Sequence, residues 1–285
     1  ELPFHQQIYH VRPDIKAIIH AHPPSIMSYS LVHSLPKTDL IPDMHIMCKP
    51  VCIVEYELPG SKMLGEKIAN AFKSGHNLAI LENHGVVVGH CDMFKAFELF
   101  EMLNYCCELN IRANMIKEPK SLSEEDINLF HSNEDIEMNE FKPCSFSSYE
   151  KQLRKGICEL SYRAYHQGLF TSAFGAISHR IGNNSFVITP ADCNKDYLEP
   201  EDLVRVENRL KEDGKKPDKT VFLHRYIYEK HHDIDSIIVA RPTNIMAFAV
   251  TDMQFNSRTV PETYIVLRDV KKVPFGYTST RLEEF

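Results

Sequence analysis

Apolar positions recur along the chain with two different periods, which predicts a mixture of helices and strands. Short apolar runs with strand character occupy residues 16–21, 51–54, 77–81, 86–88, 176–180 and 185–189. Apolar residues at three- and four-residue steps predict helices over residues 1–9, 25–32, 60–72, 92–107 and 149–167. Residues 35–49 are interrupted by prolines, and we expect a loop there. The pattern therefore predicts an α/β protein.

The chain contains two copies of one unit. An offset of 219 residues places residues 1–54 on residues 220–273 without a gap. Eleven of the first twenty-seven aligned positions are identical, among them His5 with His224 and Ile8 with Ile227. An internal repeat of this kind predicts two related structural units in tandem.

Two histidines, His20 and His22, stand in an apolar run of the first copy. Side chains at positions i and i+2 of a strand leave it on the same face, so both imidazoles are expected to point the same way. The second copy has Val239 and Arg241 at these positions, although the neighbouring isoleucines, alanine and proline recur. This selective loss indicates that the histidines form a site that the second copy no longer needs.

A third histidine, His84, stands in a turn between two predicted strands. Three neutral imidazoles leave a zinc ion one open position, which is typical of a catalytic zinc site. The alternative is that these are core or surface histidines without a ligand. Glu1 precedes His20 by nineteen residues and is the candidate carboxylate for general acid and base catalysis beside the metal.

Composition excludes several classes of protein. The net charge of −7 and pI near 6.1 argue against nucleic acid as a partner, because phosphate binding needs a basic face. No apolar run approaches the eighteen residues of a membrane span. The eight cysteines have no framework spacing, so we expect reduced thiols in a cytoplasmic protein.

A polar, acidic stretch at residues 117–147 predicts a linker between two units, one at residues 1–116 and one at residues 148–285. Matching each copy to the other predicts that the first lacks its N-terminal half and the second its C-terminal part. We therefore expect a longer tandem protein, with about seventy more residues in front and about fifty behind.

Several motifs together resemble the class II aldolase and adducin family, the group that contains L-fuculose-1-phosphate aldolase. They are Glu-x-x-x-His from Glu1, Arg-Pro-Asp from Arg12, Ile-Ile-His-Ala-His-Pro from Ile18, and Asn-His-Gly from Asn83. Residues 168–204 also resemble the opening half of that fold. The resemblance implies two tandem three-layer αβα units, each built around a largely antiparallel central sheet.

The same resemblance implies a site and a reaction. His20, His22 and His84 would bind Zn²⁺, and Glu1 would transfer protons. The implied activity is that of a metal-dependent aldehyde-lyase, which cleaves a ketose phosphate to dihydroxyacetone phosphate and an aldehyde through an enediolate. A sugar-phosphate 4-epimerase, a dehydratase and a non-catalytic, adducin-like interaction protein are the alternatives. Glu1 in place of aspartate favours aldol cleavage over epimerisation.

The second copy departs from the family's pattern at Ala176, where the family has Asn, and at Asp192, where it has Gly. Both positions belong to the family's phosphate-binding loops, so this copy is expected to be inactive as well as metal-free. Because active sites of the family form between subunits of a ring tetramer, we expect a homo-oligomer or a pseudo-tetramer of tandem units. In such an assembly the second copy would act as a partner surface for the first.

Overall fold

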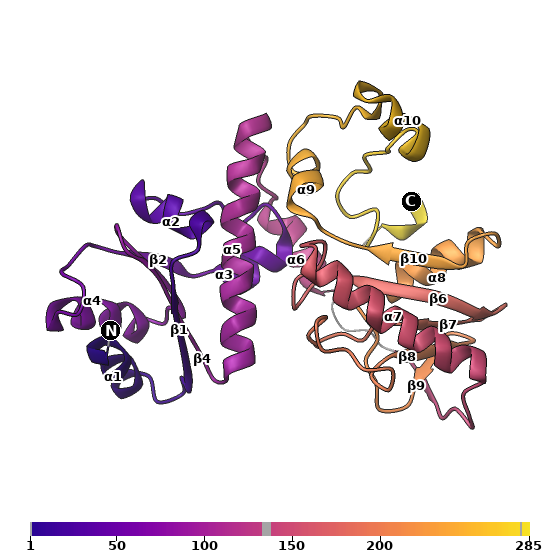
Figure 1. Ribbon diagram of the computed structural model, residues 1–285, viewed down its shortest axis with the longest axis horizontal. Coiled ribbons are helices and arrows are strands. Elements are labelled where there is room, and N and C mark those ends of the chain that lie inside the picture. The colour runs from indigo at the N-terminus through magenta and orange to yellow at the C-terminus, as the bar shows by residue number, and fades with distance from the viewer. Residues whose placement is uncertain (1, 133–137, 280) are drawn as a thin grey trace. The chain divides into compact units, whose positions relative to one another are not determined.

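The computed structural model describes residues 2–132, 138–279 and 281–285, and it divides into two compact units. Unit 1 comprises Glu1–Ser123 with Met246–Met253, and unit 2 comprises Glu124–Ile245 with Gln254–Phe285. Each unit is described by itself below (Figure 1). None of the described helices has the length and apolar character needed to cross a membrane.

The sheet of unit 1 has four strands in the order β1-β4-β3-β2. They are β1 (Ala17–Ala21), β2 (Val51–Val54), β3 (Leu78–Leu81) and β4 (Gly85–His90). β4 runs antiparallel to both β1 and β3, whereas β2 runs parallel to β3. The register places His20 opposite Val87 and Ala21 opposite Val86, so the end of β1 meets the beginning of β4.

Helices cover both faces of this sheet (Figure 1). On one face, α1 (Leu2–Val11) and α4 (Lys62–Lys73) bury Phe4, Ile8 and Phe72 against Leu81 and Val87. Strand side chains alternate between faces, so the neighbours of these strand residues point toward the other side. That side packs against α2 (Pro24–Leu31) and α5 (Met93–Ile116), and α3 (Pro42–Cys48) packs on α5. Unit 1 is therefore a three-layer αβα arrangement.

Capping residues fix the beginnings of two of these helices. The Asp92 carboxylate accepts a hydrogen bond of 2.8 Å from Lys95 N at the start of α5. The Ser61 hydroxyl accepts one of 3.1 Å from Leu64 N at the start of α4. Each cap satisfies an amide that has no partner within its own helix.

The expectation of a loop over residues 35–49 is wrong, because α3 lies within it. Pro42 occupies the first turn of α3, where its missing amide hydrogen costs no helical hydrogen bond. Met44 and Cys48 are one helical turn apart and fully buried, so tertiary packing stabilises this short helix.

Unit 2 contains a sheet of six strands in the order β10-β6-β7-β8-β9-β5, antiparallel except for β5 beside β9. The strands are β5 (Glu140–Phe141), β6 (Ala176–Gly182), β7 (Ser185–Ile188), β8 (Val204–Glu207), β9 (Leu210–Glu212) and β10 (Ser236–Val239). The helices are α6 (Glu124–Ser132), α7 (Ser148–His166), α8 (Val221–Lys230) and α10 (Pro261–Leu267), with 3₁₀ turns at Ser257–Thr259 and Leu282–Glu284. α9 (Thr243–Ala249) begins in unit 2 and continues into the segment Met246–Met253 of unit 1.

Two helices cover opposite faces of the unit 2 sheet. On one face, α7 buries Ile157 against Ile177 and Val187. On the other face, α8 buries Tyr228 against Phe186. The predicted tandem α/β fold with largely antiparallel sheets is confirmed, and α8 and β10 occupy the repeat positions of α1 and β1.

Candidate metal centre

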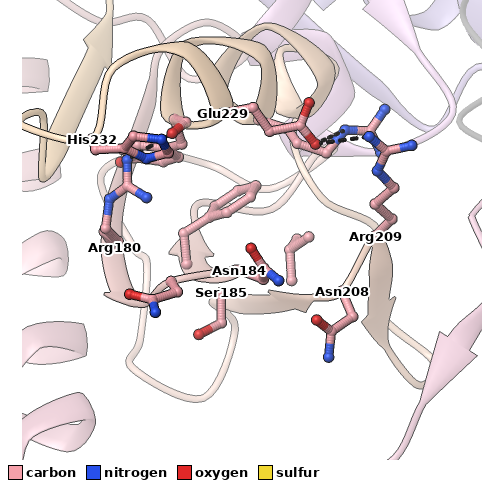
Figure 2. A pocket seen from close by; sticks show the side chains of 12 residues that line it. Arg180, Asn184, Ser185, Asn208, Arg209, Glu229 and His232 are labelled. Carbon is pink, nitrogen blue, oxygen red and sulfur yellow. Dashed lines mark hydrogen bonds and ion pairs between the residues drawn. The ribbon is translucent and has the colours of Figure 1, made fainter.

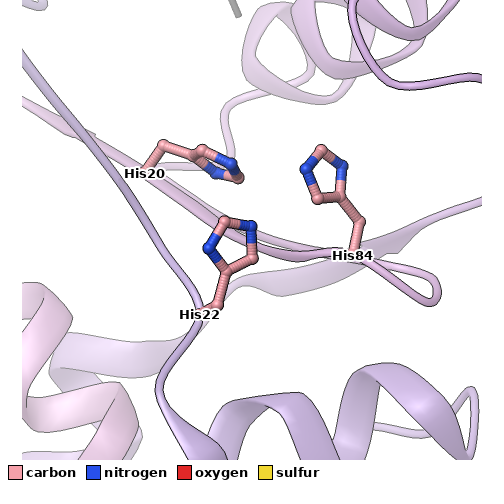
Figure 3. A group of neighbouring side chains, drawn as sticks. All are labelled: His20, His22 and His84. Carbon is pink, nitrogen blue, oxygen red and sulfur yellow. The ribbon is translucent and has the colours of Figure 1, made fainter.

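Three histidines converge at the end of β1 in unit 1 (Figure 3). One nitrogen from each of His20, His22 and His84 lies within 4.8 Å of the others. The ring centroid of His20 is 4.6 Å from that of His22 and 4.9 Å from that of His84. The structure thus brings together the three residues that the sequence predicted as ligands.

Strand geometry explains this convergence. His20 lies in β1 and His22 directly follows the strand, so the two side chains leave the same face. Continuing the register of β1 against β4 places His22 opposite Gly85, and His84 is the adjacent residue in the β3–β4 turn. Asn83 has a φ of 54°, a left-handed conformation that asparagine tolerates, and it turns the chain tightly enough to set His84 beside β1.

The His20 ring is held in one tautomer by the backbone of β4. Nδ1 of His20 lies 3.0 Å from the carbonyl oxygen of Val86. A carbonyl oxygen only accepts, so Nδ1 carries the proton and the lone pair of the neutral ring is on Nε2. Histidine ligands of metals commonly donate their other nitrogen to a backbone carbonyl in this way.

Ser30 positions His84, although nothing in the sequence reasoning identified it. This residue of α2 is fully buried, and its hydroxyl accepts a hydrogen bond of 3.1 Å from His84 N. The same hydroxyl donates one of 2.5 Å to the Leu81 carbonyl, and the Ser30 carbonyl accepts one of 3.2 Å from Asn83 N. One feature of the sequence could have identified Ser30: it is a polar residue one helical turn after Ile26, on the apolar face of the predicted helix over residues 25–32.

Gly85 leaves room for the His22 ring. A Cβ at this position would lie 2.6 Å from His22 Cδ2 and 2.7 Å from the Ala21 carbonyl oxygen. Such distances are far shorter than an ordinary contact between these atoms. The glycine that follows His84 is therefore required by the close approach of β1.

The donor set fits a divalent ion such as zinc. Three imidazole nitrogens from a rigid strand pair match the three-histidine type of catalytic zinc site, which keeps a position open for water or substrate. His22 is exposed, whereas His20 and His84 are half-buried, so the cluster is accessible from one side. Glu1, the predicted proton-transferring residue, lies outside the described residues.

A second group of donors comprises His90, Cys91 and Asp92 at the end of β4. Asp92 is already used as the cap of α5, and it accepts a hydrogen bond from the Cys91 thiol at 3.4 Å. Desolvation and the neighbouring carboxylate raise the pKa of Cys91, which disfavours the thiolate that metals bind. These interactions favour a capping arrangement over a second metal site.

The two positions equivalent to His20 and His22 in unit 2 have other uses. Val239 pairs with Ala176 in the sheet, and the Arg241 guanidinium lies 4.5 Å from the centre of the Phe174 ring. Neither side chain is a metal ligand of the imidazole type. The predicted loss of the strand ligands in the second copy therefore corresponds to an apolar strand end and a cation stacked on an aromatic ring.

The sequence model of the Class II Aldolase and Adducin N-terminal domain matches residues 1–111 and 155–281. The chain belongs to this family, and the two matched segments correspond to its two copies.

Individual relatives match part of the chain. An L-fuculose phosphate aldolase of Methanocaldococcus jannaschii is 34% identical over 118 residues, which are 41% of this chain and 62% of that protein. A 5-deoxy-D-ribulose 1-phosphate aldolase of Bacillus thuringiensis is 29% identical over 133 residues, or 45% and 59% of the two chains. A 3-oxo-tetronate 4-phosphate decarboxylase of Cupriavidus necator is 29% identical over 104 residues, or 36% and 48%.

Among solved structures, an L-fuculose 1-phosphate aldolase is 31% identical with a TM-score of 0.40, covering 45% of this chain and 60% of that one. The chain thus spans about half to three fifths of the length of these relatives.

Proposed function

We propose that this member of the class II aldolase and adducin family is a metal-dependent lyase, with its metal centre in unit 1. His20, His22 and His84 would hold the ion, and their donor chemistry favours zinc. The observation that carries the proposal is the convergence of three imidazole nitrogens within 4.8 Å. When bound, such an ion supplies Lewis-acid polarisation of a substrate carbonyl oxygen.

The protein's own residues would prepare this site for ligand and substrate. The Val86 carbonyl orients His20, and Ser30 fixes the turn that carries His84, so little rearrangement is needed when the site is filled. The start of α1 lies at the cluster, because the Phe4 ring is 5.4 Å from the His20 ring. This contact supports Glu1, at the start of the same segment, as the residue that would transfer the proton.

The reaction we favour is cleavage of a ketose phosphate to dihydroxyacetone phosphate and an aldehyde. Two of the three relatives described above are named as aldolases of sugar phosphates, and the third as a decarboxylase of a phosphorylated oxo acid. Both reactions break a carbon–carbon bond near a carbonyl group. Decarboxylation is therefore the second candidate, and the two are separated by their products.

The proposal is tested by the metal content of the purified protein after extensive dialysis. We expect about one zinc per chain, and loss of that zinc in His20→Ala and His84→Ala. Val239→Ala and Arg241→Ala are the matched controls, since they change the equivalent region of the second copy. An unaltered protein that retains no divalent metal would remove the lyase proposal and favour the adducin-like alternative.

Activity is measured on L-fuculose 1-phosphate and on 3-oxo-tetronate 4-phosphate, with the released aldehyde and carbon dioxide as the respective diagnostic products, because both cleavages also release dihydroxyacetone phosphate. Formation of the first product alone supports the aldolase. Formation of carbon dioxide alone would replace it with the decarboxylase. The eight free thiols of the chain fit a reducing compartment, and we propose the cytoplasm as the location.

A further inference from the structure

A cavity of about 450 Å³ lies within unit 2, between α8 and two turns of the sheet (Figure 2). One turn joins β6 to β7 and contributes Asn184, and the other joins β8 to β9 and contributes Asn208. The backbone N–H of Asn208 donates a hydrogen bond of 2.9 Å to the backbone carbonyl of Asn184, which ties the two turns together. The cavity thus has a fixed polar edge.

Positive charge predominates among the residues that line this cavity. Three arginines, Arg180, Arg209 and Arg225, face a single lining carboxylate, Glu229. Arg180 donates hydrogen bonds to the carbonyls of Tyr228, His231 and Ile234, so it is largely structural. Arg209 pairs with Glu229 at 3.1 Å, as Figure 2 shows. Glu229 balances the charge of Arg209, so this carboxylate does not also balance the charge of Arg225 fully.

Arg225 is a half-buried guanidinium with few partners. Its side chain is 27% exposed, and its nearest carboxylate oxygen, on Glu229, is 4.0 Å away. Within the described part of the chain it makes no hydrogen bond, and its other contact is with the Phe222 ring at 4.9 Å. Burial lowers the pKa of Arg225. A guanidinium has five donors in a planar fork suited to phosphate or carboxylate oxygens, and here that capacity is unused.

The cavity also has an apolar wall. Phe186, Val206 and Tyr228 line it, and each is at least nine-tenths buried. A ligand that fills this volume would therefore combine an anionic group, near Arg225 and Arg209, with an apolar or aromatic body. A hydrated inorganic ion would leave the apolar wall without a partner, so it fits the cavity less well than such a ligand.

Two of the charged residues of this cavity differ from their counterparts in the first copy. Helix α1 of unit 1 has Gln6 and His10 at the positions of Arg225 and Glu229. Within unit 2, the cavity lies at the Arg180 end of β6, whereas Val239 pairs with Ala176 at the other end of that strand. The cavity is therefore separate from the positions that correspond to the metal ligands of unit 1.

We propose that this cavity of unit 2 binds a small organic phosphate, with Arg225 and Arg209 on the phosphate and the Phe186 side chain against its apolar part. The proposal is independent of the function proposed for unit 1. It assigns the second copy a binding role at a place where the first copy has Gln6 and His10 instead of Arg225 and Glu229.

Isothermal titration of the full chain with phenyl phosphate tests this site, and benzyl alcohol is the uncharged counterpart. We expect phenyl phosphate to bind with a Kd below about 1 mM and benzyl alcohol not to bind. Arg225→Gln introduces the residue of the first copy and should weaken binding about tenfold or more, because a charge-assisted contact is lost. Arg209→Gln, at a 70% exposed side chain, should weaken binding without affecting folding.

Two controls locate the site. Arg258→Gln alters an exposed arginine of unit 2 outside the cavity and should leave the Kd unchanged. His22→Asn should leave it unchanged as well, because the metal centre is elsewhere. Absence of binding by the unaltered protein, an affinity in both cavity variants equal to that of the unaltered protein, or loss of binding in His22→Asn would each overturn the proposal.

Discussion

Strands β1 and β10 have the same apolar pattern but lie in different surroundings. β1 pairs with β4, which begins directly after His84, whereas β10 pairs with β6. His20 and His22 in the first strand correspond to Val239 and Arg241 in the second. The comparison separates the residues that build the strand from those that form the site.

The comparison also identifies a site residue that does not bind metal itself. Ser30, which holds the backbone of His84, corresponds to Ala249 in the second copy, whereas Ile26 recurs as Ile245. A buried hydroxyl has been lost together with the histidines, while the apolar residue one turn away has been retained. The second copy therefore acts as an internal control for which polar groups the proposed metal centre would need.

The largest effect is expected at Gly85. Gly85→Ala would force the new Cβ against the His22 ring and the Ala21 carbonyl, both closer than 3 Å. We expect a loss of about 3 kcal/mol in the free energy of unfolding of unit 1, from overpacking. Zinc affinity should fall by about a hundredfold, because His22 is displaced. Urea unfolding and a zinc competition titration measure the two quantities.

Gly156→Ala is the matched variant in unit 2. The position is inside α7, and apart from its chain neighbours and the backbone of that helix, no atom of the described residues lies within 4 Å of the Cβ that would be added there. Alanine should stabilise this helix by about 0.5 to 1 kcal/mol and leave zinc affinity unchanged. If both glycine variants behave alike, the close approach of β1 to Gly85 has no energetic importance.

A pH effect of intermediate size is expected from His224, the repeat counterpart of His5. His224 is fully buried, its Nδ1 lies 2.6 Å from the Ser178 hydroxyl, and burial lowers its pKa to about 4 from an ordinary 6.5. The unfolded chain therefore takes up a proton at this residue more readily than the folded chain does. Stability is complete above pH 6.5 and is lost as the pH falls from 6.5 toward 4.

Between pH 7 and pH 5 this residue should cost about 2 kcal/mol of the free energy of unfolding. Urea unfolding at both pH values, in the unaltered protein and in His224→Gln, isolates its contribution. The variant should show a decrease smaller by that amount. An identical pH dependence in the two proteins would mean that His224 takes up its proton equally in the folded and unfolded states.

The smallest effect is expected from Ser30→Ala, which introduces the residue of the second copy. It removes the hydroxyl that accepts from His84 N and donates to the Leu81 carbonyl, and only the 3.2 Å bond from His84 N to that carbonyl remains. We therefore expect a loss of about 1 to 2 kcal/mol in unfolding free energy and about tenfold in zinc affinity. Ser28→Ala is the control, because the exposed Ser28 hydroxyl bonds only the Pro24 carbonyl and corresponds to Ala247. Its effect should stay within about 0.5 kcal/mol. Equal effects of the two changes would contradict a special role for Ser30.

Local periodicity predicted the α/β class and the common face of His20 and His22, whereas the three-layer arrangement with largely antiparallel sheets was implied by the family resemblance. The two-residue spacing of His20 and His22 fixes their common face, and the turn before Gly85 returns the chain beside them. The spacing and the turn are short-range features that a sequence displays directly, whereas the pairing of β1 with β4 joins segments that are distant in sequence.

Features that depend on contacts between distant segments were not predicted. α3 is stabilised by burial of Met44 and Cys48, and its proline-rich sequence suggested a loop. Ser30 acts on a turn more than fifty residues away. The cavity of unit 2 requires α8 to lie across two hairpin turns, and no single segment indicates that arrangement.

The carbonyl of Val86 connects the folding of unit 1 to its proposed metal centre. β4 orients His20 through this carbonyl, and the turn that leads into β4 carries His84. A shift of β1 along β4 by a single residue would turn the His20 side chain to the other face and also move His84 away from it. Metal uptake would therefore report the correct pairing of two strands that are distant in sequence, and a mispaired intermediate of unit 1 would bind no ion.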